Sequence, residues 1–193
     1  MQKPLRDTDA AGDAALLLAY GAGDLSAARR LTARLGPRVL GFATRMLRGD
    51  RAEAEDVTQE ALLRLWKIAP DWQQGQAQVS TWLFRVTSNL CLDRLRKSGR
   101  AVALDDADEP EDDRPSALAT LETRERLTAL DAALAELPER QRQAVVLRHI
   151  EGLANPEIAE VMDISVEAVE SLTARGKRAL AAILAPQREE LGL

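Results

Sequence analysis

Residues 155–169, NPEIAEVMDISVEAV, carry the signals of two helices joined by a tight turn. Asn155-Pro156 has the chemistry of a helix cap and first turn, so a short helix is expected from there to Met162. Asp163 to Ser165 forms the turn, and a longer helix capped by Ser165 is expected to start near Val166. The apolar residues that this arrangement brings into one shared core are Ile158, Ala159, Ile164 and Val169. The pattern predicts a helix-turn-helix.

The second helix of this pattern is a candidate DNA-reading helix. In DNA-binding helix-turn-helix proteins its first turns face base edges in the major groove, and basic residues further along reach phosphates. The candidate contact residues are Val166, Glu167, Ala168, Glu170, Ser171, Arg175 and Arg178. A plain helical hairpin inside a bundle has the same spacing, so spacing alone leaves both interpretations open.

The two glutamates at the start of this helix also have two interpretations. Glu167 or Glu170 can accept a hydrogen bond from the amino group of a cytosine in the major groove, which is our hypothesis. The simpler alternative is that both carboxylates favour the positive N-terminal end of the helix.

Helical signals extend over the rest of the chain. Ala, Leu, Glu and Arg, which are strong helix formers, dominate the 193 residues, and no run of alternating β-branched residues occurs. Upstream of the helix-turn-helix, one helix is expected over 121–137 and another from Pro138 to about Ile150. An all-α fold is therefore expected.

An acidic segment divides the helical signals into two blocks. Residues 105–113 contain seven acidic residues and no basic ones, and Pro110 lies among them. Such a segment buries little surface and repels itself, so it is expected to be a flexible linker. The sequence thus predicts two small helical domains, residues 13–100 and 118–186, joined by the linker 101–117.

The last helix of the first block is expected over Thr81–Lys97, with Ser80 as its cap and Ser98-Gly99 at its end. It suits a melted DNA strand, because bases stack on aromatic rings and phosphates need cations. The inward positions at helical spacing are Leu83, Val86 and Leu90. The candidate strand-binding residues are Trp82, Arg85, Asn89, Arg94, Arg96 and Lys97. Taken alone, the helix fits a core tryptophan and solvated arginines better.

An earlier helix, expected over Ala52–Ile68, offers a candidate protein-binding face. Its inward stripe consists of Val57, Ala61, Leu62 and Leu65. The residues of the other face are Asp56, Gln59, Glu60 and Leu63. An exposed leucine among carboxylates and an amide resembles a protein-binding patch, and an ordinary solvated face is the alternative.

Together these motifs resemble the sigma-70 family of transcription initiation factors, in its extracytoplasmic-function (ECF) form. DVTQEALLRLW at 56–66 resembles region 2.2, whose helix docks on the clamp helices of the largest RNA polymerase subunit. STWLFRVTSNL at 80–90 and DRLRK at 93–97 resemble regions 2.3 and 2.4, which melt and read the minus-ten element. Three motifs in the right order are far more specific than any one.

The third motif resembles region 4, which reads the minus-thirty-five element. It consists of LPERQR at 137–142, EIAE at 157–160 and ISV at 164–166. The resemblance covers about Asp13 to Leu184, and the acidic linker matches the ECF type, which lacks regions 1.1 and 3.

The resemblance implies an alternative sigma factor with core RNA polymerase and promoter DNA as partners. It also implies an anti-sigma factor that hides the polymerase-binding faces until a stress signal arrives. The linker would thread toward the active-site and RNA-exit channel, where its charge would mimic nucleic acid. Many relatives carry Lys and Arg where this chain has Glu170 and Leu172, which leaves the promoter sequence open.

Two other classes of function compete with this interpretation. A conventional helix-turn-helix regulator binds DNA unaided, but it does not need the helices at 56–66 and 82–97. An enzyme is disfavoured, because the chain has one histidine, His149, and no Gly-rich phosphate loop or metal-ligand cluster. No catalytic residue, metal or cofactor is therefore expected.

The remaining features predict a soluble cytoplasmic protein. Cys91 is the only cysteine, so no internal disulfide forms, and its leucine neighbours predict a small core residue. Residues 1–15 lack the apolar segment of a signal peptide. No apolar run approaches the ~18 residues that span a membrane, so no membrane insertion is expected.

Overall fold

The computed structural model describes residues 6–73, 78–101 and 121–187, and the regular elements in these ranges are all helical. The α-helices are α1 (Arg6–Gly21), α2 (Leu25–Met46), α3 (Arg51–Ile68), α4 (Val79–Ala101), α5 (Leu121–Glu136), α6 (Glu139–Val145), α7 (Asn155–Met162) and α8 (Val166–Leu184). The shorter elements are η1 (Ala69–Asp71), the π-helical η3 (Val146–Ile150) and η4 (Ala185–Gln187). The all-α prediction is confirmed, whereas the linker lies largely outside the described residues.

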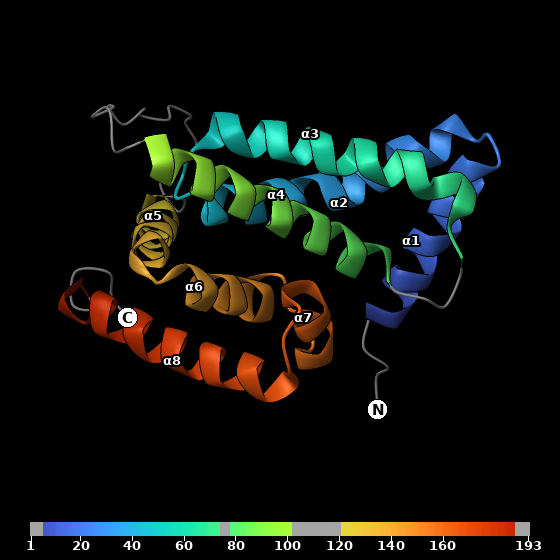
Figure 1. The fold of residues 1–193 in the computed structure, drawn as a ribbon. Helices are drawn as coiled ribbons and strands as arrows, with labels where there is room; N and C mark the ends of the chain where they lie inside the picture. The colour runs from blue at the N-terminus through green and yellow to red at the C-terminus, as the bar shows by residue number, and fades with distance from the viewer. Residues whose placement is uncertain (1–5, 74–77, 102–120, 188–193) are drawn as a thin grey trace.

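The first four helices form a bundle in which α2, α3 and α4 lie side by side and α1 packs on α2 (Figure 1). Asp24 and Asp50 cap α2 and α3, because each carboxylate accepts a backbone N–H hydrogen bond, of 2.8 and 3.0 Å. Phe42 and Phe84 meet edge to face in the core, with ring centroids 5.4 Å apart. The ring contact joins α2 to α4 in the core of the bundle.

The ends of α4 differ from the prediction. The helix begins at Val79 and includes Ser80, because the fully buried Val79 side chain holds this residue against the core. At the other end Ser98 does not terminate the helix. Its hydroxyl donates a 3.1 Å hydrogen bond to the Leu95 carbonyl, and α4 continues to Ala101.

One predicted cap in the helix-turn-helix is wrong and the other is confirmed. Asn155 is the first residue of α7, and Ala154 takes the cap position, where its N–H donates a 2.6 Å hydrogen bond to Glu157 Oε2. Ser165 caps α8 as expected, because its hydroxyl accepts a 3.2 Å hydrogen bond from the N–H of Ala168.

The C-terminal half is built around the contact of α6 with α8, and α7 packs against the start of α8 (Figure 1). Ile158 and Val169 are fully buried, whereas Ala159 and Ile164 are partly buried against the same core. The shared core predicted for the helix-turn-helix is therefore confirmed. It fixes the direction in which α8 presents its outer face.

The two halves lie against each other. Helix α7 packs on α4, α5 packs on α2, and the buried apolar residues of both halves form one continuous cluster. Side-chain contacts also cross the boundary. They are Gln143–Ser88, Arg38–Glu151 and Arg45–Asp131.

The close approach of α6 and α8 depends on Gly176. A β-carbon at this position would lie 2.5 Å from Val145 Cγ2 and 3.1 Å from the Gln141 carbonyl oxygen. We expect Gly176→Ala to lower the free energy of unfolding of the C-terminal half by about 1–2 kcal/mol through overpacking. Urea unfolding followed by circular dichroism measures this.

Gly41→Ala is the matched control in α2, where the added carbon would approach only Arg45 Nη1, the far end of a flexible side chain, at 3.2 Å. Because alanine favours helix more than glycine, this variant should be more stable by about 0.5–1 kcal/mol. If both variants unfolded at the same urea concentration, the prediction that position 176 has no room for a side chain between α6 and α8 would be wrong.

Candidate functional site

The outer face of α3 carries the residues predicted to bind a protein. Asp56 and Gln59 are exposed, and the Leu63 side chain is 59% exposed. Glu60 is partly exposed and accepts a 2.6 Å hydrogen bond from Nη2 of Arg64, one turn further along. The inward positions Val57, Ala61 and Leu65 are fully buried, and Leu62 is partly buried against the core. The exposure fits a docking face.

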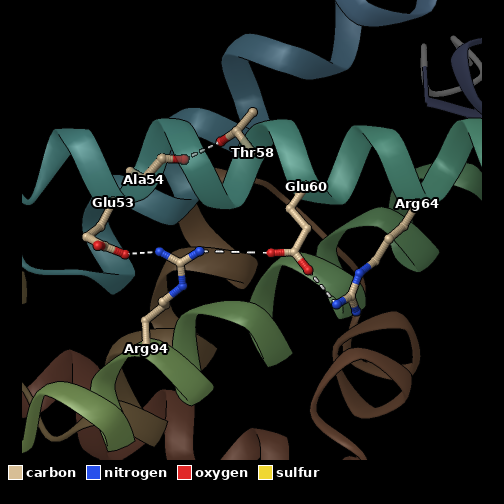
Figure 2. Close-up of polar contacts among 6 residues, drawn as sticks. All are labelled: Glu53, Ala54, Thr58, Glu60, Arg64 and Arg94. Atoms are coloured by element: carbon tan, nitrogen blue, oxygen red, sulfur yellow. Dashed lines mark hydrogen bonds and ion pairs between the residues drawn. The ribbon is translucent and has the colours of Figure 1, made fainter.

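Arg94 of α4 points toward this helix rather than toward solvent (Figure 2). Its Nη1 donates a short hydrogen bond to Glu53 Oε2, and its Nη2 lies 3.9 Å from Glu60 Oε2. The hydrogen bond with Glu53 raises the pKa of Arg94 further above its usual value. Glu53 was not among the predicted site residues, although it lies one turn before Asp56.

Three of the other candidate residues of α4 occupy the opposite side of the helix from Arg94. Arg85, Asn89 and Arg96 are exposed and line a cleft of about 450 Å³. Lys97, the residue after Arg96, is exposed but does not line this cleft. Trp82 is half-buried, and its ring meets the ring of Trp72 edge to face. Three of the six predicted residues thus share one face.

The second wall of this cleft comes from the C-terminal half. The lining residues from α6, α7 and the turn after α7 are Glu139, Arg140, Gln143, Val161, Met162 and Asp163. Sequence reasoning missed this wall, because its residues lie at least 43 positions further along the chain than Arg96. The face predicted to meet a DNA strand is therefore opposed by the helix-turn-helix unit.

Hydrogen bonds and an ion pair hold the two halves of the chain together. Inside the contact, Nε2 of Gln143 donates a 2.6 Å hydrogen bond to Ser88 Oγ, and both side chains are buried. At the edge, Nε of Arg38 lies 3.2 Å from Glu151 Oε2, and its Nη2 donates to the Glu151 carbonyl. Burial raises the pKa of Glu151, and the nearby Arg38 opposes this effect.

Helix α8 carries the predicted major-groove residues on its first four turns. Glu167, Ser171, Arg175 and Arg178 are exposed, as is Glu170, and Val166 and Ala168 are partly buried. The backbone N–H of Glu167 and the hydroxyl of Ser165 lower the pKa of Glu167. The Glu170 carboxylate accepts a 3.4 Å hydrogen bond from Asn155 Nδ2, so α7 restrains its position.

Cys91 is a buried core residue. Burial raises the pKa of the Cys91 thiol to about 12, and the residue is fully buried, as predicted for a core position. Among residues 6–73, 78–101 and 121–187, no group of three or more side chains of the metal-binding types comes together. Within the same ranges, no helix combines the length and apolar character needed to cross a membrane.

These observations define the class of protein: an all-helical chain in which a helical bundle is followed by a helix-turn-helix unit. Comparisons with known proteins give the family. The model described as sigma-70 region 2 matches residues 31–101, and that described as sigma-70 region 4 matches residues 127–180.

Similar proteins cover most of the chain. The ECF RNA polymerase sigma factor SigE of Mycolicibacterium smegmatis is 34% identical over 94% of this chain and 68% of its own length. The RNA polymerase sigma-H factor of Pseudomonas aeruginosa is 32% identical over 87% of this chain and 91% of its own. The structure of CnrH in complex with the cytosolic domain of CnrY matches with a TM-score of 0.66 and 26% identity, over 91% of this chain and 98% of that one.

The chain belongs to the ECF group of the sigma-70 family. It is an alternative sigma factor, which binds core RNA polymerase and directs promoter recognition and transcription initiation, and it is not an enzyme. The resemblance seen in the sequence motifs is confirmed.

Proposed function

We propose that α3 docks on core polymerase through the face formed by Asp56, Gln59, Glu60 and Leu63. The observation that carries this assignment is the 59% exposure of Leu63, a large apolar side chain surrounded by two carboxylates and an amide. A protein interface buries such an apolar centre and surrounds it with a polar rim. The similarity of residues 56–66 to region 2.2 supports the same face.

We propose further that residues 13–100 and 118–186 act as separate DNA-binding domains joined by residues 101–117. Arg85, Asn89 and Arg96 meet the minus-ten strand, while α8 enters the major groove at the minus-thirty-five element. Elements with these names lie about 25 base pairs apart, which is roughly 85 Å at 3.4 Å per pair. Since the two halves contact each other in the structure, the contact of α7 with α4 has to open before both elements are bound.

An inhibitory protein partner follows from the same closed arrangement. We infer that an anti-sigma factor binds the chain while α7 covers α4 and keeps it from polymerase until a stress signal arrives. The support is the similarity to CnrH, whose structure was solved in complex with the cytosolic domain of another protein, CnrY.

An initiation factor of this kind acts where polymerase acts, so we propose that the chain is cytoplasmic.

Charge reversal tests the docking face. Asp56→Lys should weaken core binding at least about fivefold, or ~1 kcal/mol, because it places a cation in the rim of the proposed interface. Asp56 is a better choice than Glu60, whose carboxylate also contacts Arg64 and Arg94. Fluorescence anisotropy of labelled protein titrated with core polymerase measures the affinity.

Glu55→Lys is the matched control, since Glu55 is also an exposed acid on α3, pairs with Arg51 and lies outside the proposed face. It should bind core with wild-type affinity. Both variants should keep the helical spectrum, because exposed substitutions change stability by only ~0.5 kcal/mol. Equal affinities for the two variants would show that the docking face is wrongly assigned.

A further inference from the structure

Arg94 joins two helices that have different proposed tasks. It extends from α4, yet its guanidinium lies between Glu53 and Glu60 of α3 (Figure 2). Its side chain is 29% exposed, so the contact is partly shielded from solvent. The carboxylate of Glu60 is shared, because Oε1 accepts from Arg64 while Oε2 faces Arg94.

The position of Arg94 on α4 separates it from the cleft. At 100° per residue, Arg94 lies about 140° around the helix from Asn89 and about 160° from Arg96. Asn89 and Arg96 themselves differ by only about 20° and line the same cleft. A guanidinium on the back of α4 that is bound to α3 therefore fixes how the front of α4 is presented.

We propose that Arg94 is a positioning residue for promoter opening: through Glu53 and Glu60 it holds α4 on the docking helix α3, so that Asn89 and Arg96 face the strand. It acts through these carboxylates and does not itself contact DNA. This inference rests on the proposed function of α3 and α4. Glu60 also belongs to the proposed docking face. Polymerase bound to that face would therefore contact the same carboxylate that faces Arg94 of α4.

The test distinguishes positioning from direct contact with DNA by changing Glu53, the hydrogen-bond partner, as well as Arg94. Arg94→Gln, Glu53→Gln and the double variant are assembled with core polymerase at saturating concentration, after core binding has been measured for each. Opening is followed by a fluorescent base in the minus-ten region. Arg94→Gln and Glu53→Gln should each slow opening about three- to tenfold, and the double variant should be no slower than either.

Two further readouts distinguish this role from a merely structural one. Arg94→Lys should recover most of the wild-type rate, because an ammonium still reaches the carboxylates. The salt dependence of promoter binding should be unchanged in Arg94→Gln, whereas loss of a phosphate contact would reduce it. Arg64→Gln is the control, since it removes the other partner of Glu60 without touching α4, and it should open promoters within about twofold of wild type.

Several results would overturn the proposal. Wild-type opening by Glu53→Gln together with slow opening by Arg94→Gln, or a reduced salt dependence in Arg94→Gln, would show direct contact with DNA. Wild-type opening by both would show no role in positioning. A wrongly assigned docking face would give a different result, because Asp56→Lys would then bind core polymerase with wild-type affinity. If Arg94→Gln did not fold, Arg94→Lys and Glu53→Gln would still decide between the two roles.

Discussion

A holoenzyme carrying both Asn89→Ala and Arg96→Ala is expected to open promoters roughly 5- to 150-fold more slowly than wild type, with core affinity unchanged. The two residues lie on one face of α4 and line the same cleft. An unstacked base gains ~1–3 kcal/mol from contacts with protein, and the arginine adds a cation for the neighbouring phosphate. Permanganate reactivity of unpaired thymines in the minus-ten region measures the opening.

The experiment has to be done in the holoenzyme. In the free chain the face carrying Asn89 and Arg96 is opposed by α6 and α7, so weak binding of DNA by the free protein would say nothing about these residues. Arg51→Ala serves as the control, because it removes an exposed arginine that pairs with Glu55 at the start of α3. Trp82→Ala is less informative, since the ring packs on Trp72 and its loss also disturbs the core.

If the Asn89 and Arg96 double variant opened promoters at the wild-type rate, α4 would have only a structural role in the bundle. Equal slowing by the Arg51 control would point instead to a general loss of positive charge. Only slowing confined to the cleft-lining residues supports the assignment of this face to the strand.

Local chemistry explains why much of this fold was predictable from sequence. The helices of both halves follow from apolar spacing and strong helix formers, and Ser165 caps α8 because its hydroxyl reaches the N–H three residues on. The prediction at Asn155 was wrong because two capping arrangements were available. A Glu157 side chain that returns to the Ala154 N–H satisfies the start of α7 without the asparagine, whose amide contacts Glu170 instead.

The features that sequence did not predict involve residues distant in the chain. The bond of Gln143 to Ser88 joins positions 55 residues apart, and the pair Arg38–Glu151 joins positions 113 apart. No local spacing encodes these contacts. Arg94 is different, because its angle around α4 is fixed by its number alone and sets it apart from Asn89. Grouping all basic residues of the helix as DNA ligands overlooked this periodicity.

Glu170→Gln is expected to change the preferred base at one position of the minus-thirty-five element by roughly 1–3 kcal/mol. Glutamate accepts a hydrogen bond from the cytosine amino group, whereas glutamine pairs with adenine, so the preference should shift from cytosine toward adenine. The Asn155 amide restrains the Glu170 carboxylate from the side of α7. Asn155→Ala should therefore weaken the same preference without replacing it.

The phosphate-binding residues should behave differently from the glutamates. Arg178 lies two turns beyond Glu170, is exposed and bonds through Nε to the Ala174 carbonyl. Arg178→Ala should weaken binding to all promoters about equally and reduce the salt slope by about one, because it removes a phosphate contact. This variant is the control that separates lost affinity from altered base preference.

Promoter selection from a randomised library, carried out with holoenzymes containing Glu167→Gln and Glu170→Gln, decides between base reading and a helix-end role. The simpler alternative is that both carboxylates stabilise the positive end of α8, by ~0.3–1 kcal/mol each. The lowered pKa of Glu167 is consistent with that role, because it arises from the backbone N–H and the Ser165 hydroxyl at the helix start. Glu170 lies beyond the first turn and is bound by Asn155, so it is the better candidate for reading a base. An unchanged sequence preference in both variants, with slightly lower stability in Glu167→Gln, would leave only the helix-end role.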